Sequence, residues 1–196
     1  MKDEGSLFAP KAKSDKDIDD HLNSLFRYSK RAIPIVKSKY ASISDAQGRL
    51  TGLISDVFLC NTPSLIKAYP NKTWLYQYTR GKAQHGNDIP AIFYNPDGSS
   101  DILGLLTTVG DFGFKSFAVT LQSYLTNFAI QGDPNRADAN STSANDILWP
   151  NVVRSEDSYA NIMDAGDRGF SIAKSGYLSG DRCEAWMSAA EIVVSG

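Results

Sequence analysis

Segments typical of strands alternate with longer segments typical of amphipathic helices along this chain of 196 residues. The sequence TWLYQYT (residues 73–79) is rich in β-branched and aromatic side chains and lies between turn signals, which predicts a strand. RGFSIAK (residues 168–174) predicts another. The alternation favours the α/β class with a mostly parallel sheet. Because only two or three strands are visible, the sheet is expected to be incomplete and flanked by helices.

The helical segments are recognised by apolar residues that recur at the spacing of one helix face. They cover residues 14–29, roughly 48–60 and about 111–131. The third is expected to end at Gly132, which is followed by Asp and Pro. A final helix is expected to begin near Ser179.

Charge and hydropathy argue against several classes of protein. The chain carries 20 Lys and Arg against 22 Asp and Glu, a net charge of −2, without a long run of either sign. It therefore lacks the basic stripe of a dedicated nucleic-acid binder. No window approaches the ~18 apolar residues of a transmembrane segment. With 42% hydrophobic residues the chain can bury one core, which argues against disorder.

The cysteines and two glycosylation sequons bear on the cellular compartment. Cys60 and Cys183 are too far apart for a local metal motif and are either two buried thiols or one long-range disulfide. Asn71 and Asn140 each begin an acceptor sequon, which favours a secreted protein. The first thirty residues nevertheless lack the apolar stretch of a signal peptide, so the compartment stays open.

Two histidines are the candidate bases. His21 lies beside two aspartates in the first helical segment and is expected to be a solvated surface residue. His85 lies in a glycine-flanked loop just after the predicted strand 73–79, where α/β folds place functional groups. Glu4, taken alone, belongs to a charged N-terminal tail.

Six short segments carry a resemblance that changes this interpretation. In order along the chain they are DEGSLF (3–8), DVFLC (56–60), HGNDIP (85–90), FAIQGDPN (128–135), LWP (148–150) and RCEAW (182–186). Together they resemble segments of the type B carboxylesterases, the family of cholinesterases and large fungal lipases. The resemblance runs over nearly the whole chain.

The resemblance implies the C-terminal portion of an α/β-hydrolase fold over residues 1–196. It implies that Glu4 is the acid and His85 the base of a Ser-Glu-His triad, and that Cys60 and Cys183 are bonded to each other. It further implies secretion and a small-molecule or lipid ester as substrate. Neither a metal ion nor another cofactor is expected.

The chain departs from the family because it contains no G-x-S-x-G nucleophile motif. The nearest match surrounds Ser171, but it ends in Ala and lies within a predicted strand after the histidine. The serine, the oxyanion loop and the strand before Glu4 are expected in an N-terminal part of the same fold, which is missing here. The chain alone is therefore expected to be inactive.

Two functional hypotheses follow, and a fragment without function is a third. The first is the C-terminal segment of a carboxylic-ester hydrolase that supplies the acid and the base of the triad. The alternative is a non-catalytic binding or adhesion module that uses the same fold as a surface. Neither hypothesis identifies the ester.

Overall fold

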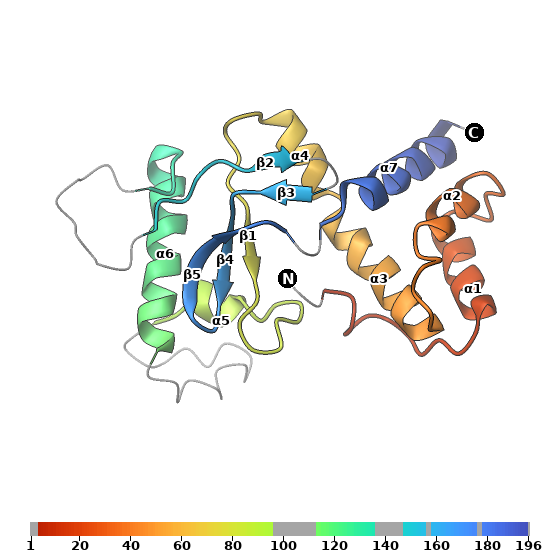
Figure 1. Cartoon of the computed structure of the whole chain (residues 1–196), viewed down its shortest axis with the longest axis horizontal. Coiled ribbons are helices and arrows are strands. Elements are labelled where there is room, and N and C mark those ends of the chain that lie inside the picture. Colours follow the sequence, from red (N-terminus) through yellow and green to blue (C-terminus); the bar gives the residue numbers. More distant parts are fainter. Residues whose placement is uncertain (1–3, 96–112, 136–146, 156–157, 176–177, 196) are drawn as a thin grey trace.

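The computed structural model describes residues 4–95, 113–135, 147–155, 158–175 and 178–195. Figure 1 shows a sheet with one long helix against it beside a group of helices. The elements are α1 (Asp15–Leu25), α2 (Ala32–Ser38), α3 (Ala46–Leu59), α4 (Thr62–Ala68), β1 (Tyr76–Tyr78), α5 (Ile89–Ile92), α6 (Phe114–Gln131), β2 (Val153–Ser155), β3 (Ser158–Ala160), β4 (Ile162–Gly166), β5 (Gly169–Ala173) and α7 (Gly180–Ser195). We call β1, β4, β5, α5 and α6 the sheet region, and α1, α2, α3 and α7 the helical region.

The sheet has the strand order β1-β4-β5, with β1 at one edge. β1 runs parallel to β4, with Tyr76 opposite Met163, whereas β4 and β5 are antiparallel. β2 and β3 form a separate antiparallel pair. The described sheet thus differs from the expected mostly parallel one, because a tight turn at Asp167 and Arg168 joins β4 to β5, and such turns connect antiparallel neighbours.

Helix α6 covers one face of this sheet. The ring of Phe117 on α6 stacks on Phe170 of β5, with 4.8 Å between the ring centroids and an interplanar angle of 8°. Leu121 is fully buried on the same helix. The helix ends at Gly132 with φ +75°, a left-handed conformation that glycine adopts without strain, as the sequence predicts.

The helical region has its own core. The first and third helices contact each other, and α7 packs against α2 and α3. Buried side chains from these helices fill the space between them, including Ile18, Leu22, Val36, Leu50, Leu53 and Ala189. Packing of these apolar faces stabilises helices that would be marginal alone.

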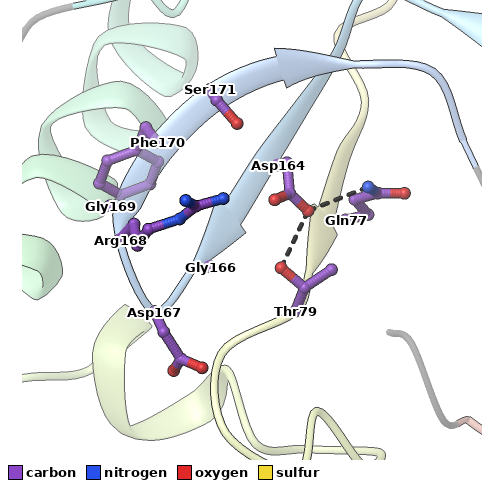
Figure 2. Close-up of a pocket in the computed structure, with 9 residues that line it drawn as sticks. All are labelled: Gln77, Thr79, Asp164, Gly166, Asp167, Arg168, Gly169, Phe170 and Ser171. Carbon is purple, nitrogen blue, oxygen red and sulfur yellow. Dashed lines mark hydrogen bonds between the residues drawn. The ribbon is translucent and has the colours of Figure 1, made fainter.

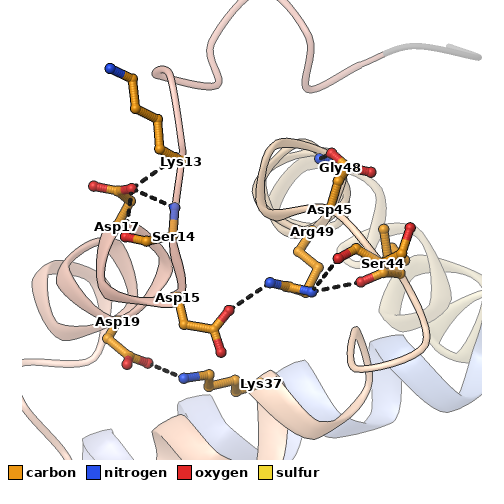
Figure 3. A network of polar contacts seen from close by, with 11 residues as sticks. Lys13, Ser14, Asp15, Asp17, Asp19, Lys37, Ser44, Asp45, Gly48 and Arg49 are labelled. Atoms are coloured by element: carbon orange, nitrogen blue, oxygen red, sulfur yellow. Dashed lines mark hydrogen bonds and ion pairs between the residues drawn. The ribbon is translucent and has the colours of Figure 1, made fainter.

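Polar contacts hold the ends of α1 and α3 together (Figure 3). The Asp45 side chain accepts a hydrogen bond from the Gly48 N–H at 2.7 Å and so caps α3. Arg49 donates to the Ile43 carbonyl at 2.7 Å and to the Asp15 carboxylate at 2.5 Å. The guanidinium therefore links the start of α1 to the loop before α3.

A disulfide and a buried ion pair join α3 to α7. Cys60 and Cys183 are bonded, with their Cα atoms 4.8 Å apart, which confirms the predicted disulfide. One turn earlier on α3, Asp56 is 1% exposed and accepts hydrogen bonds from Arg182 at 2.6 Å and from the Tyr40 hydroxyl at 2.5 Å. Burial, and then the Asp56 charge, raise the pKa of Tyr40.

Several elements were absent from the sequence prediction, among them α2, α5 and the strands β2, β3 and β4. Helix α2 contains Pro34, but the proline lies in the first helical turn, where its missing N–H costs no hydrogen bond. Strand β4 interrupts its apolar residues with Asp164 and ends at Gly166, so it lacks the pattern of a strand. The predicted helix 14–29 also ends earlier, at Leu25.

Candidate functional site

Glu4 and His85, the predicted acid and base, lie against each other. His85 Nδ1 is 2.8 Å from Glu4 Oε2, although 81 positions separate the two residues in the sequence. The glutamate side chain is 12% exposed and the histidine side chain 45% exposed. Within the described part of the chain, the other ring nitrogen of His85, Nε2, makes no hydrogen bond. Nε2 is therefore available to exchange a proton with a further group.

The His85 loop is fixed at its start by the turn between β4 and β5. Gly81 N–H donates to the Asp167 carboxylate at 2.9 Å, and Thr79 N–H donates to the Ala165 carbonyl at 2.9 Å. Gly81 adopts φ +59°, a left-handed conformation that directs the chain away from β1. The antiparallel hairpin thus determines where the loop leaves the sheet.

The end of the loop is fixed by a tyrosine on β1. The Tyr76 hydroxyl donates to Asp88 Oδ2 at 2.7 Å, just after His85 and Gly86. Burial raises the pKa of Tyr76, and the nearby Asp88 carboxylate raises it further, so the phenol keeps its proton and remains a donor. The loop is held at both ends, as a site with defined geometry requires.

The segment after Glu4 is held by α3. The Gly5 N–H donates to the Ser55 hydroxyl oxygen at 2.9 Å. A Cβ at position 5 would lie 2.4 Å from the Thr51 carbonyl oxygen, closer than any real contact, so only glycine allows this approach. The Gln84 side chain, in the His85 loop, also donates to the Ser6 hydroxyl at 3.3 Å.

Aromatic rings flank His85. The centroid of its ring lies 5.1 Å from that of Phe8 and 5.2 Å from that of Phe58. Phe8 is 51% exposed and Phe58 38% exposed, and Leu7 is exposed beside Phe8 in the sequence. The Glu4–His85 pair therefore lies next to partly exposed apolar side chains.

A separate cavity opens on the sheet face opposite α6 (Figure 2). Its volume is about 520 Å³, and residues 77, 79, 164 and 166–171 line it. Asp164 Oδ1 accepts hydrogen bonds from Gln77 and Thr79, each at 2.9 Å. Glu4 and His85 do not line this cavity, so it is not the space in which their chemistry would take place.

The other candidate residues are placed as follows. Asn71 lies in an exposed turn with φ +58°, and Asn140 lies outside the described residues. Ser171 is exposed on β5 and lines the sheet cavity. His21 is half-buried in α1, rather than fully solvated as expected, and burial lowers its pKa. Over the described ranges, no three His, Cys, Asp or Glu residues could hold a metal ion, and no helix is long and apolar enough to cross a bilayer.

Sequence reasoning missed the side chains that support the pair. Ser55 and Phe58 lie within a predicted helix, where they are indistinguishable from other surface and core positions. Asp167 gave no signal because its partner, Gly81, is 86 positions away, and Tyr76 gave none because a tyrosine within a strand has no distinctive pattern. A glycine directly after Glu4 was a usable signal, since glycine often marks a close backbone approach.

Comparison with known proteins found a similar sequence and similar solved structures. Over 192 residues the chain is 29% identical to a secreted lipase of Arthroderma benhamiae, and the alignment covers 94% of this chain and 35% of the lipase. The structure superposes on the crystal structure of Aspergillus niger EstA with a TM-score of 0.68 and 17% identity, covering 96% of this chain and 38% of EstA. No family model matches the chain.

These comparisons establish the fold class and the extent of the match. The predicted class, an α/β fold of the α/β-hydrolase type with an incomplete sheet, is confirmed by the likeness to EstA. The chain spans about 35% of the length of the curated lipase that it matches.

Proposed function

We propose that this chain is the C-terminal part of a secreted carboxylic-ester hydrolase of the type B carboxylesterase kind, in which it supplies the acid and the base of the catalytic triad. The observation that carries the proposal is the 2.8 Å contact between His85 Nδ1 and Glu4 Oε2. A carboxylate on Nδ1 fixes the tautomer in which Nε2 accepts a proton, and it stabilises the imidazolium that results. A non-catalytic binding module has no need of such a pair.

The serine nucleophile is proposed to come from an N-terminal part of the same fold. In the reaction, His85 Nε2 takes the proton of the serine hydroxyl while the serine oxygen bonds to the ester carbonyl carbon. The same proton passes to the alcohol oxygen as the ester C–O bond breaks, which leaves an acyl-serine. Water then attacks the acyl carbon and gives a proton to Nε2, which returns it to the serine as the carboxylic acid leaves. None of these protons passes to Glu4, whose role is to hold the imidazole and stabilise its cation.

The edge of the sheet supports the proposal of a missing part. Over the described residues, β1 pairs only with β4 and has no neighbour along its other edge. Figure 2 shows the Gln77 amide oxygen pointing away from Asp164, and this buried oxygen accepts no hydrogen bond from the described residues. An added strand would pair with the edge of β1, as open sheet edges readily do. Whole relatives are about three times longer than the match, which leaves room for such a part.

Secretion and the substrate class are proposed from the same observations. The disulfide between Cys60 and Cys183 is typical of proteins from oxidising compartments, and the relative from Arthroderma benhamiae is described as secreted. That relative is a lipase, so we propose lipid or other apolar esters as substrates. The exposed turn at Asn71 suits a glycosylation site, and Asn140 is proposed as a second on its sequon alone.

Complementation tests this function. The chain is co-folded with the N-terminal region of a related lipase that carries G-x-S-x-G and the oxyanion loop, and hydrolysis of a p-nitrophenyl ester is measured. We expect no turnover by the chain alone and turnover by the complemented protein. His85→Ala should lower kcat by on the order of a millionfold, and Glu4→Gln by roughly 10⁴-fold, because the amide cannot stabilise the imidazolium.

The second histidine provides the matched control. His21→Ala lies in α1, outside the site, and should leave turnover unchanged. Turnover by the chain alone that survives His85→Ala would show that another residue is the catalyst and would overturn the proposal.

A further inference from the structure

We infer that the last two turns of α3 position the acid and the base relative to each other, with Ser55 acting on Glu4 and Phe58 acting on His85. This inference rests on the proposed function, since it assigns positioning residues to the same pair. Neither residue touches a reacting atom in the proposed chemistry. Both would act by fixing the geometry of the 2.8 Å contact.

Ser55 positions the acid through the backbone that follows it. The hydroxyl oxygen of Ser55 accepts the Gly5 N–H at 2.9 Å, one residue beyond Glu4. Gly5 is buried, and a Cβ there would lie 2.7 Å from the Ser55 backbone nitrogen. The backbone next to Glu4 therefore lies flat against the helix, which restricts where the carboxylate can point.

Phe58 positions the base by contact with its ring. The rings of Phe58, Phe8 and His85 lie against one another, with all three centroid distances between 5.1 and 5.3 Å. Phe8 comes from the segment that carries Glu4, and Phe58 comes from α3. Because these two rings contact the imidazole from different elements, they limit its rotation about the Cβ–Cγ bond. The ring is thereby kept in the orientation in which Nδ1 faces Glu4.

Both residues lie on one face of a helix that is itself fixed. Ser55 and Phe58 are three residues apart, so they are neighbours on the helix surface. Between them, Asp56 is bound to Arg182 on the opposite, buried side, and Cys60 is bonded to Cys183. The end of α3 thus cannot shift without breaking contacts to α7, and a rigid support is what a defined acid–base geometry requires.

Nuclear magnetic resonance tests the geometry on the chain itself. The measured quantity is the signal of the proton on His85 Nδ1, which the Glu4 contact protects from exchange with water, and His21 serves as internal reference. Ser55→Ala and Phe58→Leu should each weaken or abolish this signal. Val57→Ala is the matched control, because Val57 and Phe58 are adjacent and are both 38% exposed. The control should retain the signal, as should Phe58→Tyr, which keeps the ring.

Kinetics of the complemented protein give the second measurement. Phe58→Leu and Ser55→Ala should lower kcat by up to about 100-fold with KM unchanged, because misplacement of a catalytic group affects the reaction and not binding. Phe58→Tyr should recover most of kcat. A variant whose Nδ1 proton signal equals that of the wild type would overturn the positioning role of that residue, whatever its kcat.

The two experiments separate this inference from the proposed function. If the wild-type complemented protein shows no ester turnover, the proposed function fails. The resonance experiment needs no turnover, so a normal Nδ1 proton signal in both variants would overturn the positioning role alone.

Discussion

The helical region and the sheet region differ in how completely their apolar side chains are covered and their backbone hydrogen bonds are formed. In the helical region, the disulfide and the Asp56–Arg182 ion pair join helices around a closed core. In the sheet region, α6 covers one face, while β1 has an unpaired edge within the described sheet and a polar cavity opens on the other face. Within the described residues, the helical region thus encloses its core, whereas the sheet region leaves one strand edge and one face uncovered.

The proposed site lies where these two regions meet. Glu4 is held on α3 through Gly5, and His85 extends from a loop of the sheet region. Under the proposed function, the helical region would hold Glu4 and help to orient His85 without any strand added at the edge of β1. Each of the following predictions tests one side of the contrast.

The largest effect is expected on removing the disulfide. Replacing Cys60 and Cys183 together by Ser should lower the free energy of unfolding by roughly 5 kcal/mol in a loop-entropy argument, because the bond closes a loop of 123 positions. Urea denaturation without reductant measures this loss. Amide exchange should quicken first in α3 and α7, while β4 keeps its protection. Equal loss of protection in both regions would contradict the contrast.

The next effect compares two carboxylates, one from each region. Asp56→Ala should lower the free energy of unfolding by about 3 kcal/mol, since it leaves the Arg182 guanidinium and the Tyr40 hydroxyl without their buried acceptor. Asp164→Ala should cost only about 1 kcal/mol, because its donors, Gln77 and Thr79, are neutral and the cavity beside them admits water. Chemical denaturation of both variants gives the comparison. A larger loss for Asp164 would reverse our ranking of the two regions.

Alkaline pH should lower the free energy of unfolding, because both regions contain buried tyrosine hydroxyls that would have to ionise. The pKa values of Tyr40 and Tyr76 are raised chiefly by burial, and burial raises the pKa of Tyr78 to about 12. A group whose pKa is raised on folding stabilises the folded state below its unfolded pKa, here 10.0. Stability should therefore fall as pH rises above 10, by up to about 1.4 kcal/mol per pH unit for each phenol.

Phenolate absorbance sharpens this test. Tyr78, in the sheet region, should ionise near pH 12, before Tyr76 and before Tyr40 of the helical region. Replacing Tyr78 by Phe should remove the earliest part of the buried titration. Ionisation of all three near pH 10 would mean that neither core excludes water.

The smallest effect is expected from the cap of α3. Asp45→Ala removes the acceptor of the Gly48 N–H and should cost about 1 kcal/mol. Because the disulfide fixes the other end of the helix, the His85 signals should stay unchanged in this variant. A shift of those signals would show that the whole helix, and not only its last two turns, sets the geometry.

The elements that could be predicted from the sequence are those marked by patterns within a short stretch of the chain. The long helix α6 was foreseen from its apolar spacing and its glycine stop, and β5 from its composition. Strand β4 was missed because Asp164 points to a polar cavity in the middle of an otherwise buried strand. The register of β1 beside β4 depends on contacts such as Tyr76 with Met163, 87 positions apart, and local composition does not encode them.

The candidate site was foreseen in part, for a related reason. Glu4 and His85 were singled out because the short segments around them resemble motifs of a known family. Ser55 and Phe58 were missed, since a serine or phenylalanine on a helix has no distinctive pattern. Their importance arises only from what packs against them.

The bond between Cys60 and Cys183 turns the chain from 60 to 183 into a closed covalent ring. His85, the whole sheet and α6 lie inside the ring, whereas Glu4 lies on the linear arm before it. A protease that cuts once within the ring leaves both products linked, so they would migrate as one species until a reductant is added. A single cut on the arm between residues 5 and 59 breaks the covalent link between Glu4 and the ring without any reductant. His85 is thus linked to the helical region by two covalent paths, and Glu4 by only one.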